Sequence, residues 1–103
     1  MFIKVKTQTH NKVDFIDITP EVQKIVSESG VKEGICFLYC PHTTAGIVLN
    51  ENWDPTVERD IAMALEHMIP EHLPYRHSEG NSPGHIKSVL VGSDHFIFIQ
   101  MGS

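Results

Sequence analysis

The feature that most constrains the fold is the alternation of short apolar runs with segments of helical periodicity. The clearest helical segment starts at Asp54-Pro55, where Asp can cap free main-chain N–H groups and Pro fits the first helical position. Apolar residues then recur every three to four positions as far as Pro70, at Val57, Ile61, Leu65 and Met68. The pattern predicts an amphipathic helix with one face on a core.

Two further helices are predicted by similar signals. Thr19-Pro20 repeats the pairing of a capping residue with proline, and Gly30 supplies the left-handed residue that commonly follows a helix. Ser82-Pro83 can start a shorter third helix, which Gly92 would close.

The remaining apolar runs have strand character. Residues 2–9 alternate between apolar and polar side chains, residues 12–18 read as a second strand, and His10-Asn11 can turn the chain between them, so a hairpin is predicted. Three more strands are predicted at residues 35–39, 47–49 and 95–101.

The resulting order is β-β-α-β-β-α-α-β, in which helices do not alternate strictly with strands. This order predicts an α+β domain with a mainly antiparallel sheet and helices packed on one face. A chain of 103 residues is long enough for one modest core, and no linker or internal repeat is visible. We therefore expect a single domain over residues 1–103.

Composition excludes several classes of function. Apolar residues make up 41% and charged residues 20% of the chain, which is typical of a globular protein. The net charge of -5 argues against nucleic-acid binding, and any phosphate ligand would need local donors. No apolar run is long enough to cross a membrane and no signal segment is visible, so no membrane partner and a cytoplasmic location are expected.

The two cysteines, Cys36 and Cys40, are predicted to be buried free thiols. Four residues of extended strand separate their Cα atoms by about 13 Å. A disulfide requires a separation of about 4.4–6.8 Å.

Three histidines fall at polar breaks between the predicted elements: His42, His77 and His85. Three imidazoles and a water are a common ligand set for catalytic zinc. Seven histidines in an acidic chain could equally be surface groups or hydrogen-bonded loop residues.

Other polar residues near these breaks are candidates for catalysis and substrate binding. Glu51 could serve as a general base, or it could pair with Arg76. Arg76 could hold a phosphate through two parallel hydrogen bonds, or form a salt bridge. Four neutral side chains are candidate substrate ligands or turn-capping residues: Thr43, Thr44, Asn50 and Asn81. No phosphate loop, dinucleotide fingerprint or nucleophile elbow is present.

Four motifs together resemble the YjbQ family, also called uncharacterised protein family 0047, some of whose members are described as secondary thiamine-phosphate synthases. The motifs are Cys40-Pro41-His42-Thr43-Thr44-Ala45-Gly46, Asn50-Glu51-Asn52, Tyr75-Arg76-His77, and Gly80-Asn81 followed by His85. The resemblance implies a homotrimer with a largely antiparallel α+β fold. It also implies a divalent metal, with zinc expected, at His42, His77 and His85.

The chain departs from that family in two places. Ser82-Pro83-Gly84 replaces a stretch where many relatives carry Ala and an acidic or His residue. Relatives also continue past the position of Ser103 into further strands, so the chain is expected to be a fragment or a shortened relative. Residues 95–101 are apolar on both strand faces. This predicts either that the chain associates with copies of itself, as a trimer, or that it is a piece of a longer protein.

Three hypotheses about function follow. The first is a metal-dependent enzyme of thiamine-phosphate synthase type, which joins a pyrimidine diphosphate to a thiazole phosphate and releases pyrophosphate. The second is a metal-dependent hydrolase of a small substrate, and the third is a trimer that binds a metal or ligand without catalysis.

Overall fold

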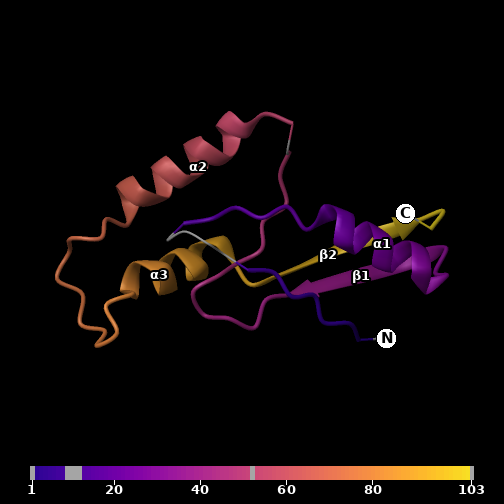
Figure 1. Ribbon diagram of the computed structural model, residues 1–103, viewed down its shortest axis with the longest axis horizontal. Coiled ribbons are helices and arrows are strands. Elements are labelled where there is room, and N and C mark those ends of the chain that lie inside the picture. Colours follow the sequence, from indigo (N-terminus) through magenta and orange to yellow (C-terminus); the bar gives the residue numbers. More distant parts are fainter. Residues whose placement is uncertain (1, 9–12, 52, 103) are drawn as a thin grey trace. The chain divides into compact units, whose positions relative to one another are not determined.

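The computed structural model describes residues 2–8, 13–51 and 53–102 (Figure 1). The elements follow one another in the order α1 (Thr19–Ser29), β1 (Glu33–Tyr39), α2 (Pro55–Met68), α3 (Ser82–Val91) and β2 (Asp94–Gln100). Helices and a two-stranded sheet together confirm the predicted α+β class. The chain divides into two compact units, Met1–Cys36 with Phe98–Ser103, and Phe37–Ile97.

The three predicted helices form, and Asp54 caps the start of α2 as predicted. The capping roles predicted for Thr19 and Ser82 are wrong, because each is the first residue inside its helix, and the preceding residue makes no side-chain cap bond in either case. Asp54 Oδ1 accepts hydrogen bonds from the Thr56 main-chain N–H at 2.9 Å and from the Thr56 hydroxyl at 2.7 Å. These two donors, the hydroxyl foremost, hold the pKa of the Asp54 carboxyl below its usual value of 3.8. At the other end of a helix, Gly30 follows α1 with φ 75°, a left-handed conformation that favours glycine.

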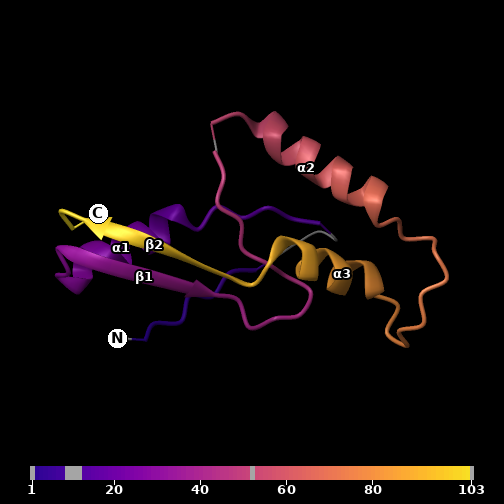
Figure 2. The same ribbon diagram turned by 180° about the vertical axis from the view of Figure 1, so that it is seen from behind.

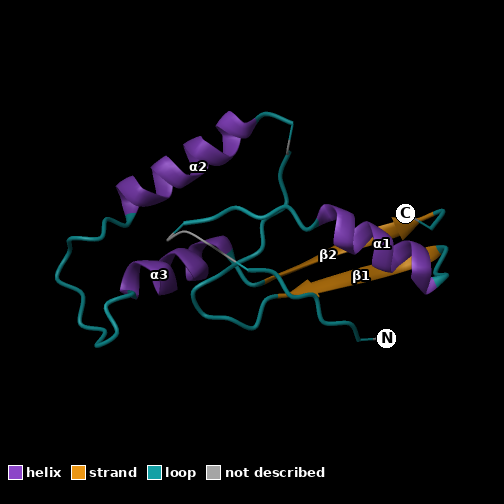
Figure 3. Ribbon diagram, viewed as in Figure 1, coloured by secondary structure: helices purple, strands orange, loops and turns teal. Residues whose placement is uncertain are grey.

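The two strands pair with each other in opposite directions (Figure 3). At one end of the pair the Cys40 N–H donates to Ser93 O at 2.8 Å, and at the other the Gly102 N–H donates to Lys32 O at 3.0 Å. The pairing confirms the strands predicted at residues 35–39 and 95–101 and their antiparallel arrangement. Both cysteines are free, as predicted, and half-buried.

Three strand predictions are wrong for the residues that the structure describes. Residues 2–8, 13–18 and 47–49 belong to no strand. The predicted turn at His10-Asn11 lies outside the described residues. Alternating side chains give a segment an apolar face, but a strand forms only where a neighbour takes up its main-chain hydrogen bonds. Among the described residues, β1 and β2 pair with each other and so take up each other's main-chain hydrogen bonds.

In the first unit, α1 lies on one face of the strand ends (Figures 1 and 2). Val26 of α1 and Ile99 of β2 are buried there, at 5% and 6% exposure. Covered and exposed residues alternate along β2, as expected for a sheet with a helix on one side. The helical covering of one face of the sheet is therefore confirmed.

The second unit contains α2 and α3. A Lys87 Nζ donor on α3 pairs with Glu66 Oε1 on α2, and Ile69 and Pro83 are buried. No helix in the described part of the chain has the length and apolar character needed to cross a membrane.

Candidate functional site

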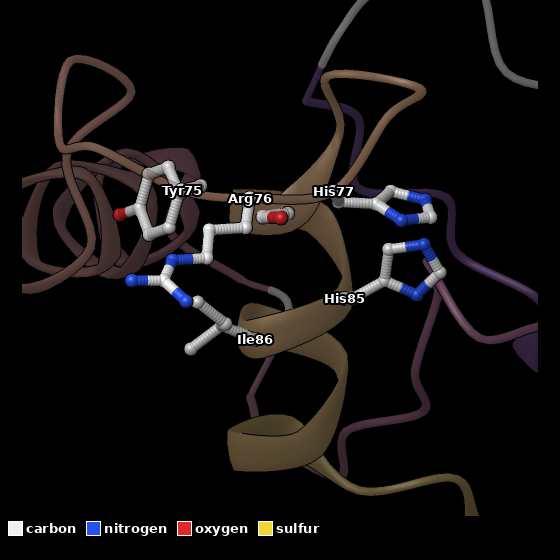
Figure 4. A pocket seen from close by; sticks show the side chains of 6 residues that line it. Tyr75, Arg76, His77, His85 and Ile86 are labelled. Atoms are coloured by element: carbon white, nitrogen blue, oxygen red, sulfur yellow. The ribbon is translucent and has the colours of Figure 1, made fainter.

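A cavity of about 300 Å³ lies at the start of α3, within the second unit (Figure 4). We call it the α3 hollow. Six residues line it: Tyr75, Arg76, His77, Ser82, His85 and Ile86. Three of them, Arg76, His77 and His85, are predicted site residues, so the fold brings these three together.

The imidazoles of His77 and His85 lie edge to face in the α3 hollow. Their ring centroids are 4.9 Å apart, with an interplanar angle of 86°. His77 belongs to the loop before α3 and His85 to the first turn of that helix. Gly80, with φ 73°, donates its N–H to His77 O at 3.1 Å, and this turn returns the loop to the helix. The His77 Nε2 atom also lies 3.8 Å from Glu79 Oε2.

Arg76 lies on the other side of the α3 hollow, beside Tyr75 and Ile86 (Figure 4). The Tyr75 hydroxyl donates to Pro70 O at 2.6 Å, which fixes the ring. Among the described residues Arg76 forms no ion pair with Glu51 or another carboxylate. Its guanidinium is therefore open to an anionic ligand.

His42 is not part of the α3 hollow. With Thr43 it lines a second cavity, of about 270 Å³, beside the C-terminal half of α3. Within residues 2–8, 13–51 and 53–102, no three His, Cys, Asp or Glu side chains are grouped closely enough to hold a metal ion. The structure thus pairs two of the three predicted imidazoles, and the complete ligand set stays a prediction.

The four predicted neutral ligands have different surroundings. A Cβ atom on Gly84 would lie 3.5 Å from Thr44 Cβ, so Thr44 packs on the first turn of α3. Asn50 Oδ1 accepts the Glu51 N–H at 2.7 Å in an exposed stretch.

Asn81 is the residue that precedes α3, but its side chain makes no cap bond. The second helical residue is Pro83, which has no N–H to donate. The Gly84 N–H donates instead to Asn81 main-chain O at 3.1 Å. Asn81 Oδ1 is consequently buried without a hydrogen-bond partner among the described residues.

Sequence reasoning missed the residues that hold the loop carrying His42. The Ser88 hydroxyl donates to Ala45 O at 2.5 Å, and His95 Nε2 donates to Ile47 O at 2.8 Å. These partners are 43 and 48 residues apart in the chain, and no motif signals such pairs.

Comparison with known proteins shows the family to which the chain belongs. The family model described as UPF0047 protein YjbQ-like matches residues 3–103. The chain belongs to the YjbQ family. The UPF0047 protein MJ1081 of Methanocaldococcus jannaschii is 48% identical over 102 residues, which are 99% of this chain and 74% of the relative. The UPF0047 protein YugU of Bacillus subtilis is 40% identical over 103 residues, covering 99% and 78%.

Solved structures of YjbQ relatives have the same fold. A YjbQ/UPF0047 protein from Clostridium acetobutylicum superposes with a TM-score of 0.91 at 50% identity, covering 94% of this chain and 75% of that one. A protein of unknown function from Sulfolobus solfataricus has a TM-score of 0.89 at 27% identity, covering 94% and 71%. The predicted family and fold are confirmed, and none of these names states an activity.

Proposed function

We propose that this YjbQ-family chain is a small-molecule enzyme of secondary thiamine-phosphate synthase type. In that reaction a thiazole nitrogen bonds to the carbon that carries the diphosphate of a pyrimidine, the carbon–oxygen bond breaks, and pyrophosphate leaves with the electron pair. The observation that carries the proposal is the α3 hollow, where a guanidinium and two imidazoles border an apolar wall of Tyr75 and Ile86.

Two local sources of positive potential support a phosphate substrate in a protein of net charge -5. Arg76 has a planar fork of donors that matches a phosphate group, and it has no carboxylate partner among the described residues. Ser82 lines the same hollow at the N-terminus of α3, where the helix dipole favours anions. These groups would stabilise the charge that develops on departing pyrophosphate.

A divalent cation is proposed to bind at His77 and His85. Because the ligands are imidazoles, the cation is proposed to be zinc. Two imidazoles on one zinc ion have ring centroids about 5 Å apart, given Zn–N bonds of about 2 Å. The 4.9 Å between these rings fits that requirement. His42 is the proposed third ligand, and the loop that carries it would have to approach the α3 hollow. When bound, the cation would supply positive charge opposite the leaving group.

Glu51 is proposed as a catalytic residue of the site that acts through its negative charge, because the thiamine-phosphate step releases no proton. Its carboxylate is exposed and forms no ion pair within the described part of the chain. Thr43, Thr44, Asn50 and Asn81 are proposed to contact substrate.

A homotrimer is proposed as the working assembly. In the second unit three aromatic side chains on one strand face are more than half exposed: Phe37, Tyr39 and Phe96. The rings of Phe37 and Phe96 stack with centroids 6.5 Å apart. An exposed aromatic strand face of this kind favours association with another chain.

The direct test is product analysis with the two thiamine precursors. We expect thiamine phosphate and pyrophosphate in equal amounts, and loss of both in Arg76→Ala. Arg59→Ala, at an exposed position on α2, is the matched control and should retain activity. Unchanged precursors after incubation with folded protein loaded with zinc would contradict the proposal.

Metal content is tested separately by elemental analysis. Replacing His42, His77 or His85 by Ala should each lower bound zinc by about an order of magnitude, because a site with three protein ligands loses much of its affinity with one of them. His67→Ala, on the exposed side of α2, is the control. Unchanged stoichiometry in all three variants would refute the metal site.

A further inference from the structure

We infer that Tyr75 and Ile86 form a subsite for the flat ring of the substrate, whose phosphate binds at Arg76. The inference rests on the proposed function and extends it, because it assigns one end of the α3 hollow to one of the two substrates. That substrate is the pyrimidine diphosphate, in which a single carbon joins the ring to the phosphates. Tyr75 is then the residue that determines specificity for the ring.

The α3 hollow has two chemically different ends. Successive residues of a helix are about 100° apart around its axis, so His85 and Ile86 point to different sides of α3. Figure 4 shows the two imidazoles together at one end, and Arg76 with Tyr75 and Ile86 at the other. The second end combines an apolar wall with a guanidinium, and we call it the ring subsite.

The ring of Tyr75 is held in place before any ligand binds. Its hydroxyl donates to Pro70 O at 2.6 Å, and its main-chain N–H donates to Leu73 O at 2.8 Å. Tyr75 is thus bonded through both side chain and main chain to the loop that follows α2. Because the ring is already ordered, a second flat ring can stack on it with little loss of conformational freedom.

Few main-chain donors at the start of α3 are available to the phosphate. Pro83 has no N–H, and the next two residues of the helix donate theirs to Asn81 O at 3.1 and 3.4 Å. Arg76 forms no ion pair among the described residues, so its fork of donors is open to a phosphate. The phosphate is therefore expected at Arg76, next to the apolar wall.

The size of the α3 hollow fits one substrate. Its volume of about 300 Å³ is at the lower end of the range of about 300–1,000 Å³ for small-molecule sites. With the pyrimidine diphosphate in the ring subsite, the thiazole phosphate has to approach from outside the hollow.

The test measures binding of benzyl phosphate, in which one carbon joins a flat ring to a phosphate group. Calorimetry with the protein as purified should show benzyl phosphate binding about tenfold more tightly than inorganic phosphate, because the ring adds an aromatic pair and buried apolar area. Tyr75→Leu should remove most of this preference and leave the affinity for inorganic phosphate unchanged. Arg76→Ala should weaken the binding of both probes.

Further variants separate the ring of Tyr75 from its anchor. Tyr75→Phe and Tyr75→Leu both lose the bond to Pro70 O, but only Tyr75→Leu loses the ring, so Tyr75→Phe should retain the preference for benzyl phosphate. Ile86→Ala should lower the preference severalfold. Leu90→Ala, at an exposed position one turn further along α3, is the matched control and should not change it.

Equal affinity for benzyl phosphate and inorganic phosphate would overturn the inference, as would an unchanged preference in Tyr75→Leu and Ile86→Ala. Failure of the folded protein to bind either probe would overturn it as well. The proposed function has a separate outcome. If benzyl phosphate binds as expected but no thiamine phosphate forms from the two precursors, the ring subsite stands and the proposed reaction fails.

Discussion

Replacing Gly46 by Ala should destabilise the protein, because the loop at Gly46 lies directly on the end of α3. The added Cβ would lie 2.7 Å from Gly92 O, whereas ordinary contact begins at 3.4 Å, so one group must move by about 0.7 Å. Gly92 O is main chain and accepts the Ile47 N–H at 3.0 Å, so a shift also weakens that bond. Overpacking and the weakened hydrogen bond together predict a loss of about 2–3 kcal/mol.

Gly84→Ala is the matched control, because it adds the same methyl group at the other end of the same contact. Its Cβ would lie 3.5 and 3.6 Å from Thr44 atoms, which is ordinary van der Waals contact. Gly84 is inside α3, where Ala is favoured over Gly by about 0.5–1 kcal/mol. The two substitutions should therefore change stability in opposite directions.

Urea unfolding followed by circular dichroism measures both effects. All variants should be compared at one protein concentration, because association would contribute to the apparent stability. Gly46→Ala should unfold at lower urea than the parent protein, and Gly84→Ala at equal or higher urea. If Gly46→Ala were as stable as the parent, or Gly84→Ala the less stable of the two, the described contact between loop and helix would be refuted.

Four further predictions concern the site, the start of α2 and assembly. Glu51→Gln should keep the fold and the bound metal but lower turnover, because the amide lacks the negative charge of the carboxylate; unfolding of this variant would indicate a structural role instead. Arg76→Lys should raise KM for the phosphate substrate about tenfold or more, because Lys cannot form the bidentate pair; unchanged kinetics would exclude a phosphate contact. Asp54→Ala should destabilise the protein at pH 7 and lose that effect at low pH. The pKa of this carboxyl is lowered in the folded state, so its contribution is present above about pH 3.8 and disappears as the pH falls through the folded value; a penalty independent of pH would contradict this. Sedimentation at low micromolar concentration should show an assembly, with a trimer expected, because aromatic side chains are exposed on the strand pair; a cooperatively folding monomer would rule this out.

Local signals in the sequence were sufficient for the helices and for two strands. Asp54-Pro55 predicts the start of α2 because a carboxylate can accept free N–H groups at that position, and the Thr56 bonds have that geometry. The strand prediction at residues 47–49 failed because its hydrogen bonds go elsewhere. Ile47 bonds to Gly92 and to the imidazole of His95 rather than to a neighbouring strand.

The candidate site was predicted in part. The polar breaks of the sequence indicated Arg76, His77 and His85, and the structure brings these three residues together in the α3 hollow. They also indicated His42, which the structure places along a different cavity. Motif reading identifies residue types suited to a chemistry, but the distance between two loops depends on how each loop packs against the intervening helix.

The sequence by itself determined which segments form helices, which family the chain belongs to, and which side chains are suited to bind phosphate or metal. These properties depend on neighbouring residues and on motifs that can be read directly along the chain. Only the tertiary structure decided which strands pair, which histidines meet, and that Ser88 and His95 anchor the loop. The reason is that main-chain carbonyls such as Ala45 O and Ile47 O are the same in every residue. Their partners are therefore chosen by packing between distant segments and not by residue type.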